Sequence, residues 1–372
     1  MKPEQALTKN NMEEKRHTEQ KILDVIEKNR SRVAVGFILL LVGSIGLLYS
    51  VLSGKTRSTQ TGSEINIEVP TPSDVRVRYL DGALVPTGEE DLAPFAVMVE
   101  NYPDAWPLSG VSKAQVVIEA PVEGGITRFM LLIDPVTDVS EIGPIRSARP
   151  YYVEYADSWH AFYTHVGGSP EGLSLIQTKD NLIDIDQFRY GNTFWRSILR
   201  FAPHNVYTSM ELLRDFVTTN GIGDKRTPLG WQFSPHEPDT SLGNIDRIEI
   251  PYGGIYDVTW EYDAKENHFV RYQNGRMQED KDGAVVTAKN VIVMETEAEV
   301  LDSVGRLKLR TTGKGDAIGF QNGEQYQIEW QRYEDEMIQF RADEGQYTLL
   351  PGTTWVEILT DEKATVTLRD DS

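Results

Sequence analysis

The chain of 372 residues contains no cysteine. Without a thiol it cannot form a disulfide, a thiolate metal site, a cysteine nucleophile or a lipid-modified cysteine. It also has no Gly-x-x-x-x-Gly-Lys-Ser/Thr phosphate loop, no Gly-x-Ser-x-Gly elbow and no His-Glu-x-x-His pair, which removes three large enzyme classes from consideration. The sequence therefore identifies no cofactor, and we expect no metal site.

Positive charge is scarce. There are 37 Lys and Arg against 57 Asp and Glu, a net charge of −20. The first 32 residues hold eight basic and six acidic residues, so the remainder carries about −22. A surface that follows a phosphate backbone needs the opposite sign, and we therefore expect no nucleic-acid partner.

One segment lacks charge of either sign. No charged residue occurs between Arg32 and Lys55, and Val33–Leu52 is almost wholly apolar. As a helix this run is about 30 Å long, enough to cross a bilayer. Basic residues are denser before the run than after it, which favours a cytoplasmic N-terminus. The sequence predicts a cytoplasmic tail over 1–32, a transmembrane helix over 33–52 and an extracytoplasmic remainder.

A cleaved signal peptide is the competing interpretation of this run. Its apolar core would be about 7–15 residues long and would end at a small-residue site. The run here is longer, and residues 49–54 offer no such site, so a retained anchor is favoured. The next stretch, 53–74, is rich in Ser, Thr, Gly and Pro, which predicts a linker.

Residues 75–227 are expected to form a layered, mixed α/β domain. It should begin with a hairpin that turns at Asp81-Gly82. Continuous apolar runs predict strands buried on both faces, at 95–99, 116–118 and 129–133. Helices are expected at 151–158, 171–177 and 210–218.

The proline-rich stretch 228–238 predicts a boundary, and 239–361 is expected to be a β-rich, mostly antiparallel domain. Asn274-Gly275 and Asn322-Gly323 are strong hairpin signals. Further strands are predicted at 258–262, 269–272, 291–294, 307–309, 326–330 and 354–358.

One candidate binding element is a glycine-rich turn. Ala161 to Val166 reads as a strand that carries His165, and Gly167, Gly168 and Ser169 then lead into a helix. Free N–H groups at such a helix start can bind an anion. On the structural alternative, the glycines only permit a tight turn and Ser169 only caps the helix.

Arginines strengthen the case for an anion. Arg146 and Arg149 lie three positions apart, so on a helical turn both could grip one phosphate or carboxylate. The alternative is that they pair with nearby carboxylates such as Glu141 and Glu154.

Further polar residues next to glycine turns extend this set: Glu123, Arg128, His204 and Asn205. Together they predict a shared polar cleft. For a binding site, the arginines would supply charge and the histidines directed hydrogen bonds. For an enzyme, His165 or Glu123 would act as the base.

The segments APFAVMVEN, GGITRF, GPIRSARP, HVGGSP and APHNVYTS, followed by Pro351–Trp355, resemble the YerB-like family of bacterial lipoproteins of unknown function. This resemblance covers nearly all of the chain after the linker. It implies a two-part extracytoplasmic protein and supplies no reaction. Since this chain has no cysteine to lipidate, the Val33–Leu52 helix would have to provide the anchor.

The order of Thr127-Arg128, the turn at Asp134–Thr137, the arginine-bearing segment and the Gly-Gly turn is also similar to LytR-CpsA-Psr proteins. Those are membrane-anchored enzymes that transfer polymers from lipid pyrophosphate carriers to the cell wall. We therefore expect an envelope protein that binds an anionic or glycan-like ligand or assists envelope assembly. The alternative is a hydrolase or phosphotransferase acting on a phosphorylated or lipid-linked envelope precursor.

Overall fold

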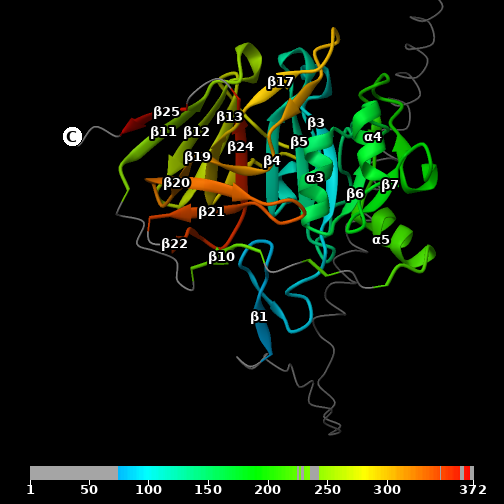
Figure 1. Cartoon of the computed structure of the whole chain (residues 1–372), viewed down its shortest axis with the longest axis horizontal. Helices are drawn as coiled ribbons and strands as arrows, with labels where there is room; N and C mark the ends of the chain where they lie inside the picture. The colour runs from blue at the N-terminus through cyan, green and yellow to red at the C-terminus, as the bar shows by residue number, and fades with distance from the viewer. Residues whose placement is uncertain are drawn as a thin grey trace, which may run out of the picture. The chain divides into compact units, whose positions relative to one another are not determined.

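The computed structural model describes residues 74–223, 226–227, 230–234, 243–343, 345–360 and 364–368 (Figure 1). The predicted tail, the predicted transmembrane helix and residues 53–73 of the predicted linker lie outside this part. Within the described residues, no helix has both the length and the apolar character needed to cross a bilayer. The described chain is mainly β-sheet and has few helices.

An 11-stranded mixed sheet forms the centre of the structure. Its strand order is β22-β21-β20-β19-β16-β24-β4-β5-β3-β6-β7. Five strands come from the predicted N-terminal half: β3 (Phe95–Glu100), β4 (Val116–Pro121), β5 (Thr127–Ile133), β6 (Phe162–His165) and β7 (Ile183–Asp186). Six come from the C-terminal half: β16 (Asn290–Glu295), β19 (Gly313–Gln321), β20 (Glu324–Arg332), β21 (Gln339–Ala342), β22 (Gly345–Gln346) and β24 (Thr354–Leu359).

The junction between the halves is a strand pair. β24 lies parallel to β4, with Thr354 opposite Val116 and Glu357 opposite Glu119. On its other edge β24 lies parallel to β16. The two halves predicted from the sequence therefore contribute to one continuous sheet.

Both faces of this sheet are covered, which explains the continuous apolar runs. Successive side chains of a strand point to opposite faces: Val97 and Val99 belong to one core cluster, and Ala96 and Met98 to the other. The first cluster includes side chains of a second sheet, such as Trp260. The second cluster includes side chains of the helix that crosses the other face, seen in front of β3 to β5 in Figure 1.

The second sheet has six strands, and five follow the order β14-β13-β12-β11-β25. Their bounds are β11 (Ile245–Ile250), β12 (Val258–Asp263), β13 (His268–Gln273), β14 (Arg276–Met277) and β25 (Thr365–Leu368), and β15 (Thr287–Ala288) pairs with β13. Alternate side chains of β12 are buried, as expected for a sheet with one face on the core. At the predicted hairpins, Asn274 and Gly275 have φ of 49° and 68°, and Asn322 and Gly323 have 55° and 66°. Positive φ at both turn residues is what an Asn-Gly hairpin requires.

The three predicted helices are present: α3 (Pro150–Ser158), α4 (Pro170–Ile176) and α5 (Met210–Thr219). Proline occupies the start of α3 and of α4, where its missing N–H costs nothing. Ser169 and Ser209 cap α4 and α5 by accepting backbone N–H groups of Gly172 and Leu212 at 3.1 and 3.2 Å.

The remaining elements are short. Four two-stranded pairs join β1 (Val75–Val77) to β2 (Leu84–Pro86), β8 (Trp195–Arg196) to β9 (Val206–Tyr207), β10 (Gln232–Phe233) to β23 (Thr348–Leu349), and β17 (Ala298–Val300) to β18 (Leu307–Leu309). Single 3-10 turns are η1 (Pro103–Ala105), η2 (Val111–Lys113), η3 (Glu123–Gly125), η4 (Gly191–Thr193) and η5 (Gly254–Tyr256).

Candidate functional site

Four of the predicted site residues line one small pocket of about 250 Å³, which we call the arginine pocket. The four are Glu123, Arg128, Arg146 and His204. The rest of its lining is Glu100, Asn101, Tyr102, Asp104, Val122, Ile126 and Thr127. These residues come from the end of β3, the start of β5, the turns beside them and the loop before β9.

Arg128 lies deep in this pocket and is only 5% exposed. Its Nη1 donates to the carbonyl oxygen of Ser147 at 2.7 Å, and among the described residues it has no carboxylate partner. Burial is the main cause that lowers its pKa to about 10, with the charges of Arg149 and Arg146 adding to the effect. At neutral pH Arg128 therefore remains a cation, and no described protein anion neutralises it directly.

Arg146, Glu100 and His204 form a connected group at the pocket wall. The Nε of Arg146 lies 3.1 Å from Oε1 of Glu100, and its Nη1 donates to the carbonyl oxygen of Pro203 at 3.2 Å. His204 Nδ1 lies 2.7 Å from Oε2 of the same glutamate. The imidazole stacks on Tyr102 with ring centroids 5.3 Å apart.

Arg149 is held by Glu123. Its Nε donates to Glu123 Oε2 at 2.9 Å, and its Nη2 contacts Oε1. Burial alone would raise the pKa of Glu123, but the hydrogen bond and charge of Arg149 outweigh it and lower that pKa to about 2. The pair is therefore internally neutral, and Glu123 is a weak proton acceptor near pH 7.

His165, the other predicted base, does not line the arginine pocket. Its side chain is fully buried in β6, with Nε2 2.7 Å from Asp184 Oδ1 and Nδ1 2.7 Å from the carbonyl oxygen of Gly167. Both ring nitrogens thus have protein partners. This geometry is what the structural alternative for His165 predicts.

The polar groups of the glycine turn after His165 likewise bond to other groups of the protein. Gly167 N–H donates to Asp186 Oδ1 at 2.8 Å, and Ser169 N–H donates to the carbonyl oxygen of Ala148 at 3.2 Å. Gly168 packs so closely that a Cβ there would lie 3.1 Å from Leu173. These contacts agree with the structural alternative for this turn, which is a tight connection with a serine cap.

Asn205 lies in the loop before β9, outside the lining of the arginine pocket. Its Oδ1 accepts from Arg196 Nη1 at 2.9 Å.

Sequence reasoning missed Glu100, Asn101, Tyr102 and Thr127 as lining residues. The available signal was the polar pair Glu100-Asn101 directly after the apolar run 95–99.

The floor of the arginine pocket connects to buried polar side chains. Asn101 Nδ2 donates to Thr127 Oγ1 at 2.7 Å and to Gln273 Oε1 at 3.0 Å. Gln273 belongs to β13, and Asn101 follows β3. The pocket floor is therefore also a contact between the two sheets.

Behind it lies a buried arginine between two carboxyl groups. Arg271 Nη2 donates to Glu119 Oε2 at 2.5 Å, and the guanidinium lies 4.7 Å from the ring centre of Trp355. Glu357 accepts from Trp260 Nε1 at 2.8 Å and from the Tyr252 hydroxyl at 2.9 Å. Burial and the charge of Glu119 raise the pKa of Glu357 well above its ordinary value. We therefore treat Glu357 as neutral and Glu119 with Arg271 as the ion pair.

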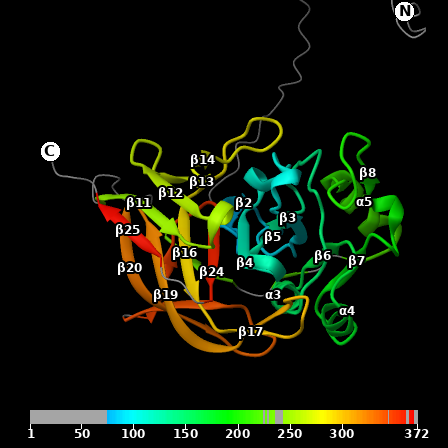
Figure 2. The same ribbon diagram turned by 90° about the horizontal axis from the view of Figure 1, so that it is seen from above.

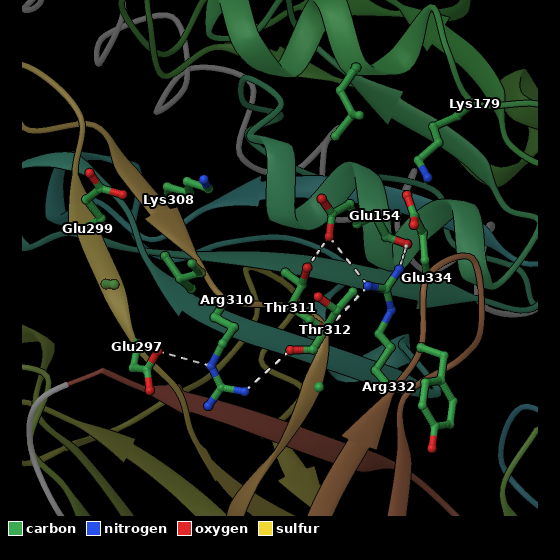
Figure 3. A pocket seen from close by; sticks show the side chains of 15 residues that line it. Glu154, Lys179, Glu297, Glu299, Lys308, Arg310, Thr311, Thr312, Arg332 and Glu334 are labelled. Atoms are coloured by element: carbon green, nitrogen blue, oxygen red, sulfur yellow. Dashed lines mark hydrogen bonds and ion pairs between the residues drawn. The ribbon is translucent and has the colours of Figure 1, made fainter.

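A larger cavity of about 810 Å³ lies between α3, α4 and the strands β17 to β20 (Figure 3). Four basic and four acidic side chains line it, and several pair with one another. Arg310 Nε lies 3.2 Å from Glu297 Oε2, and Arg332 Nη1 lies 3.4 Å from Glu154 Oε2. Because opposite charges balance there, the cavity shows no preference for one sign of ligand.

Comparisons with known proteins identify relatives. The family described as "Protein of unknown function (DUF3048) N-terminal domain" matches residues 82–223, and its C-terminal domain matches residues 248–356. The "Putative lipoprotein YerB" of Bacillus subtilis (strain 168) is 30% identical over 276 residues, 72% of this chain and 81% of that protein. The crystal structure of the YerB protein from Bacillus subtilis has a TM-score of 0.71 at 26% identity, covering 78% of this chain and all of that one.

These matches confirm the resemblance found in the sequence. They extend across both halves of the described structure. The chain therefore belongs to the YerB-like family and contains both the N-terminal and the C-terminal DUF3048 domain.

Proposed function

We propose that this protein is a membrane-anchored, extracytoplasmic envelope protein that binds an anionic ligand in the arginine pocket. The name of its Bacillus relative, a lipoprotein, supports an extracytoplasmic position at the membrane. Because this chain has no cysteine, the predicted helix over 33–52 would replace the lipid.

The observation that carries the proposal is the charge of Arg128, which has no carboxylate partner among the described residues. Glu100 contacts Arg146 and His204, and Glu123 contacts Arg149, so the inner carboxylates of the pocket already have cationic partners. Asp104 lies at the exposed rim, where water screens its charge. The interior of the pocket is thus left with an uncompensated guanidinium, which a phosphate or carboxylate would neutralise.

The size of the pocket limits what enters it. A volume of about 250 Å³ is below the range of about 300–1,000 Å³ typical of sites for drug-sized ligands. We infer that it takes one phosphate or one acidic sugar, and that the rest of a glycan or lipid carrier stays outside.

Isothermal titration of the full chain in detergent with pyrophosphate, glucose-1-phosphate and glucuronate tests this proposal, with glucose as the neutral comparison. We expect binding of the anions only. Arg146→Gln should weaken binding by roughly 10- to 100-fold, since a charge-assisted hydrogen bond contributes about 1.5–3 kcal/mol. Arg128→Gln should have at least that effect.

Arg310→Gln is the matched control, since this arginine lies in the larger cavity and should leave binding unchanged. Thermal unfolding of each variant separates loss of binding from loss of folding. Absence of binding by the unmodified protein to every anion, or equal binding by all variants, would refute the proposal.

The Glu100–His204 contact favours a second candidate function, an enzyme acting on a phosphorylated or lipid-linked envelope precursor. A carboxylate on Nδ1 holds the imidazole so that Nε2 can accept a proton. Among the described residues Nε2 of His204 has no partner. In this function His204 takes the role of base that the sequence suggested for His165 or Glu123.

Turnover of a phosphate ester distinguishes the two functions. For an enzyme, His204→Gln should lower the rate by about 100-fold or more while anion binding persists. His160→Gln, a histidine outside the pocket, is the control. If the unmodified protein binds anions and does not turn over esters, the binding function stands alone.

A further inference from the structure

The loop between β8 and β9 exposes large apolar side chains at its tip, residues 197–201. Ile198 is 97% exposed, Leu199 83% and Phe201 91%. Phe188, in the neighbouring loop after β7, is 74% exposed. Single exposed apolar residues are common, but a cluster of this kind marks an interaction surface.

Hydrogen bonds hold this loop tip in place. Arg200 donates from Nη1 to the carbonyl oxygen of Asp104 at 3.0 Å and from Nη2 to that of Pro107 at 2.8 Å. At the base of the loop, Ser197 N–H donates to the carbonyl oxygen of Asn205 at 2.8 Å. The apolar side chains are therefore presented outward by a fixed backbone. Figure 2 shows β8 beside α5, at the end of the molecule opposite β25.

The charged residues of this stretch of sequence are all basic, whereas the whole chain is acidic. No Asp or Glu occurs from Gln187 to Met210, in a chain whose net charge is −20. The same stretch contains three arginines. Arg196 bonds to Asn205 and Gln187, Arg200 bonds to backbone carbonyls, and Arg189 lies over the ring of Tyr190 at 5.1 Å. None of the three pairs with a carboxylate in the part of the chain that the structure describes.

We propose that the loop tip docks onto the surface of an anionic lipid bilayer. Exposed apolar side chains in a stretch whose only charged residues are arginines match the boundary between acyl chains and phosphate headgroups. The predicted linker of about 20 residues, with a root-mean-square span of about 25 Å, lets the anchored protein reach its own membrane. Because His204 lines the arginine pocket and follows the loop tip directly, docking brings the pocket to the headgroup layer.

The absence of cysteine permits a direct test. In the full chain reconstituted into vesicles, Leu199→Cys gives a unique attachment point for an environment-sensitive fluorophore. In vesicles of phosphatidylcholine mixed with phosphatidylglycerol, we expect a blue-shifted emission that lipid-borne quenchers reduce. Val300→Cys, at an apolar residue 64% exposed in β17, is the matched control and should remain in water.

Removing positive charge tests the electrostatic part of the proposal. Arg189→Gln and Arg196→Gln should each lower the docked population by about 5-fold in anionic vesicles, and neutral phosphatidylcholine should give weaker docking than anionic lipid. These substitutions lie outside the lining of the arginine pocket, so ligand binding should not change. Failure of docking and failure of anion binding are therefore distinguishable.

Two outcomes would overturn the proposal. In one, the label at residue 199 is as exposed to water as the label at residue 300 in every vesicle. In the other, its protection depends on protein concentration and not on lipid composition, which would identify a second copy of the chain as the occupant.

Discussion

Glu123 and Glu357 are both carboxyl groups near arginines, but their surroundings move their pKa values in opposite directions. Arg149 lowers the pKa of Glu123 to about 2, whereas burial next to Glu119 raises the pKa of Glu357. In the unfolded chain both should titrate near 4.5. The two residues therefore make opposite contributions to how stability depends on pH.

Glu123→Gln tests the first contribution. Because the folded pKa is depressed, the ion pair contributes stability above about pH 4.5 that is lost as the pH falls toward 2. We expect the variant to lose about 1–3 kcal/mol at pH 7 and to show a shallower decline in acid. Urea unfolding between pH 3 and 7 measures both, with Glu336→Gln as the exposed control. Equal pH profiles for the variant and the unmodified protein would contradict the assignment.

Glu357→Gln tests the second contribution. The folded state keeps its proton where the unfolded state has lost it, so the unmodified protein loses stability as the pH rises above about 4.5. Glutamine cannot titrate, so the variant should show a flatter profile from pH 5 to 8. If the free energy of unfolding changes with pH equally in both proteins, Glu357 is ionised in the folded state.

Replacing Arg271 should lower the free energy of unfolding by more than either glutamate substitution. It is fully buried and contacts Glu119, Gln273 and the ring of Trp355. Removing one member of a buried ion pair leaves the other uncompensated, at a cost of about 3–5 kcal/mol. Arg271→Met should therefore lower the free energy of unfolding by about that amount. Arg214→Met, at a surface arginine, should change it by less than about 1 kcal/mol.

At the scale of elements, local signals located the helices, the two Asn-Gly hairpins and the strands with apolar runs, but not β7, β11, β19, β21 or β25. The three helices begin at a proline or follow a serine cap, and the Asn-Gly turns form hairpins, because these features depend on neighbours in sequence. The buried strands follow from apolar runs. What the sequence did not reveal is which strands pair across the sheet, since that depends on contacts between residues far apart in the chain.

In the candidate site, too, local sequence patterns were not enough, because contacts between distant residues decide which side chains meet. His165 and the glycine turn look like a binding motif locally, yet their polar groups bond to Asp184, Asp186 and Ala148. Arg128 and Arg146 enter the same pocket because β3, β5 and the segment after β5 come together. The pocket walls at Glu100 and Asn101 could be recognised only after that pairing was known.

The turn at Asn274-Gly275 gives a prediction for a single element. Gly275 has φ of 68°, and the space that a Cβ would occupy there is open, so any effect of a side chain is purely conformational. Gly275→Ala should lower the free energy of unfolding by about 1 kcal/mol. Gly191→Ala, with equal space and no positive φ, is the control and should be neutral or slightly stabilising. Equal effects of both substitutions would contradict the hairpin geometry.

At the scale of the whole molecule, the two family domains share their sheet and their polar core. β24 pairs with β4, and Arg271 of the second sheet pairs with Glu119 of β4. The sequence predicts domain limits of 75–227 and 239–361. Such limits do not mean that each domain folds by itself. From these contacts we expect each half to need the other in order to fold.

Expression of residues 74–227 alone tests this dependence. The fragment would expose the apolar edge of β4 and an unpaired buried carboxylate, so we expect it to aggregate or to lack cooperative unfolding. Co-expression with the C-terminal half should restore a soluble complex, as seen by size-exclusion chromatography. A monomeric fragment with a sharp thermal transition would show that the first half folds by itself.

The place of β24 has a consequence for biosynthesis. This strand spans Thr354–Leu359 and lies in the interior of the sheet between β4 and β16. As the polypeptide leaves the ribosome, β4 is completed more than 200 residues before β24, its neighbour on one edge, is made. The growing chain must therefore keep an open, aggregation-prone edge on β4 until residue 359 has emerged, and a stop codon anywhere before residue 354 would remove the strand that joins the two halves.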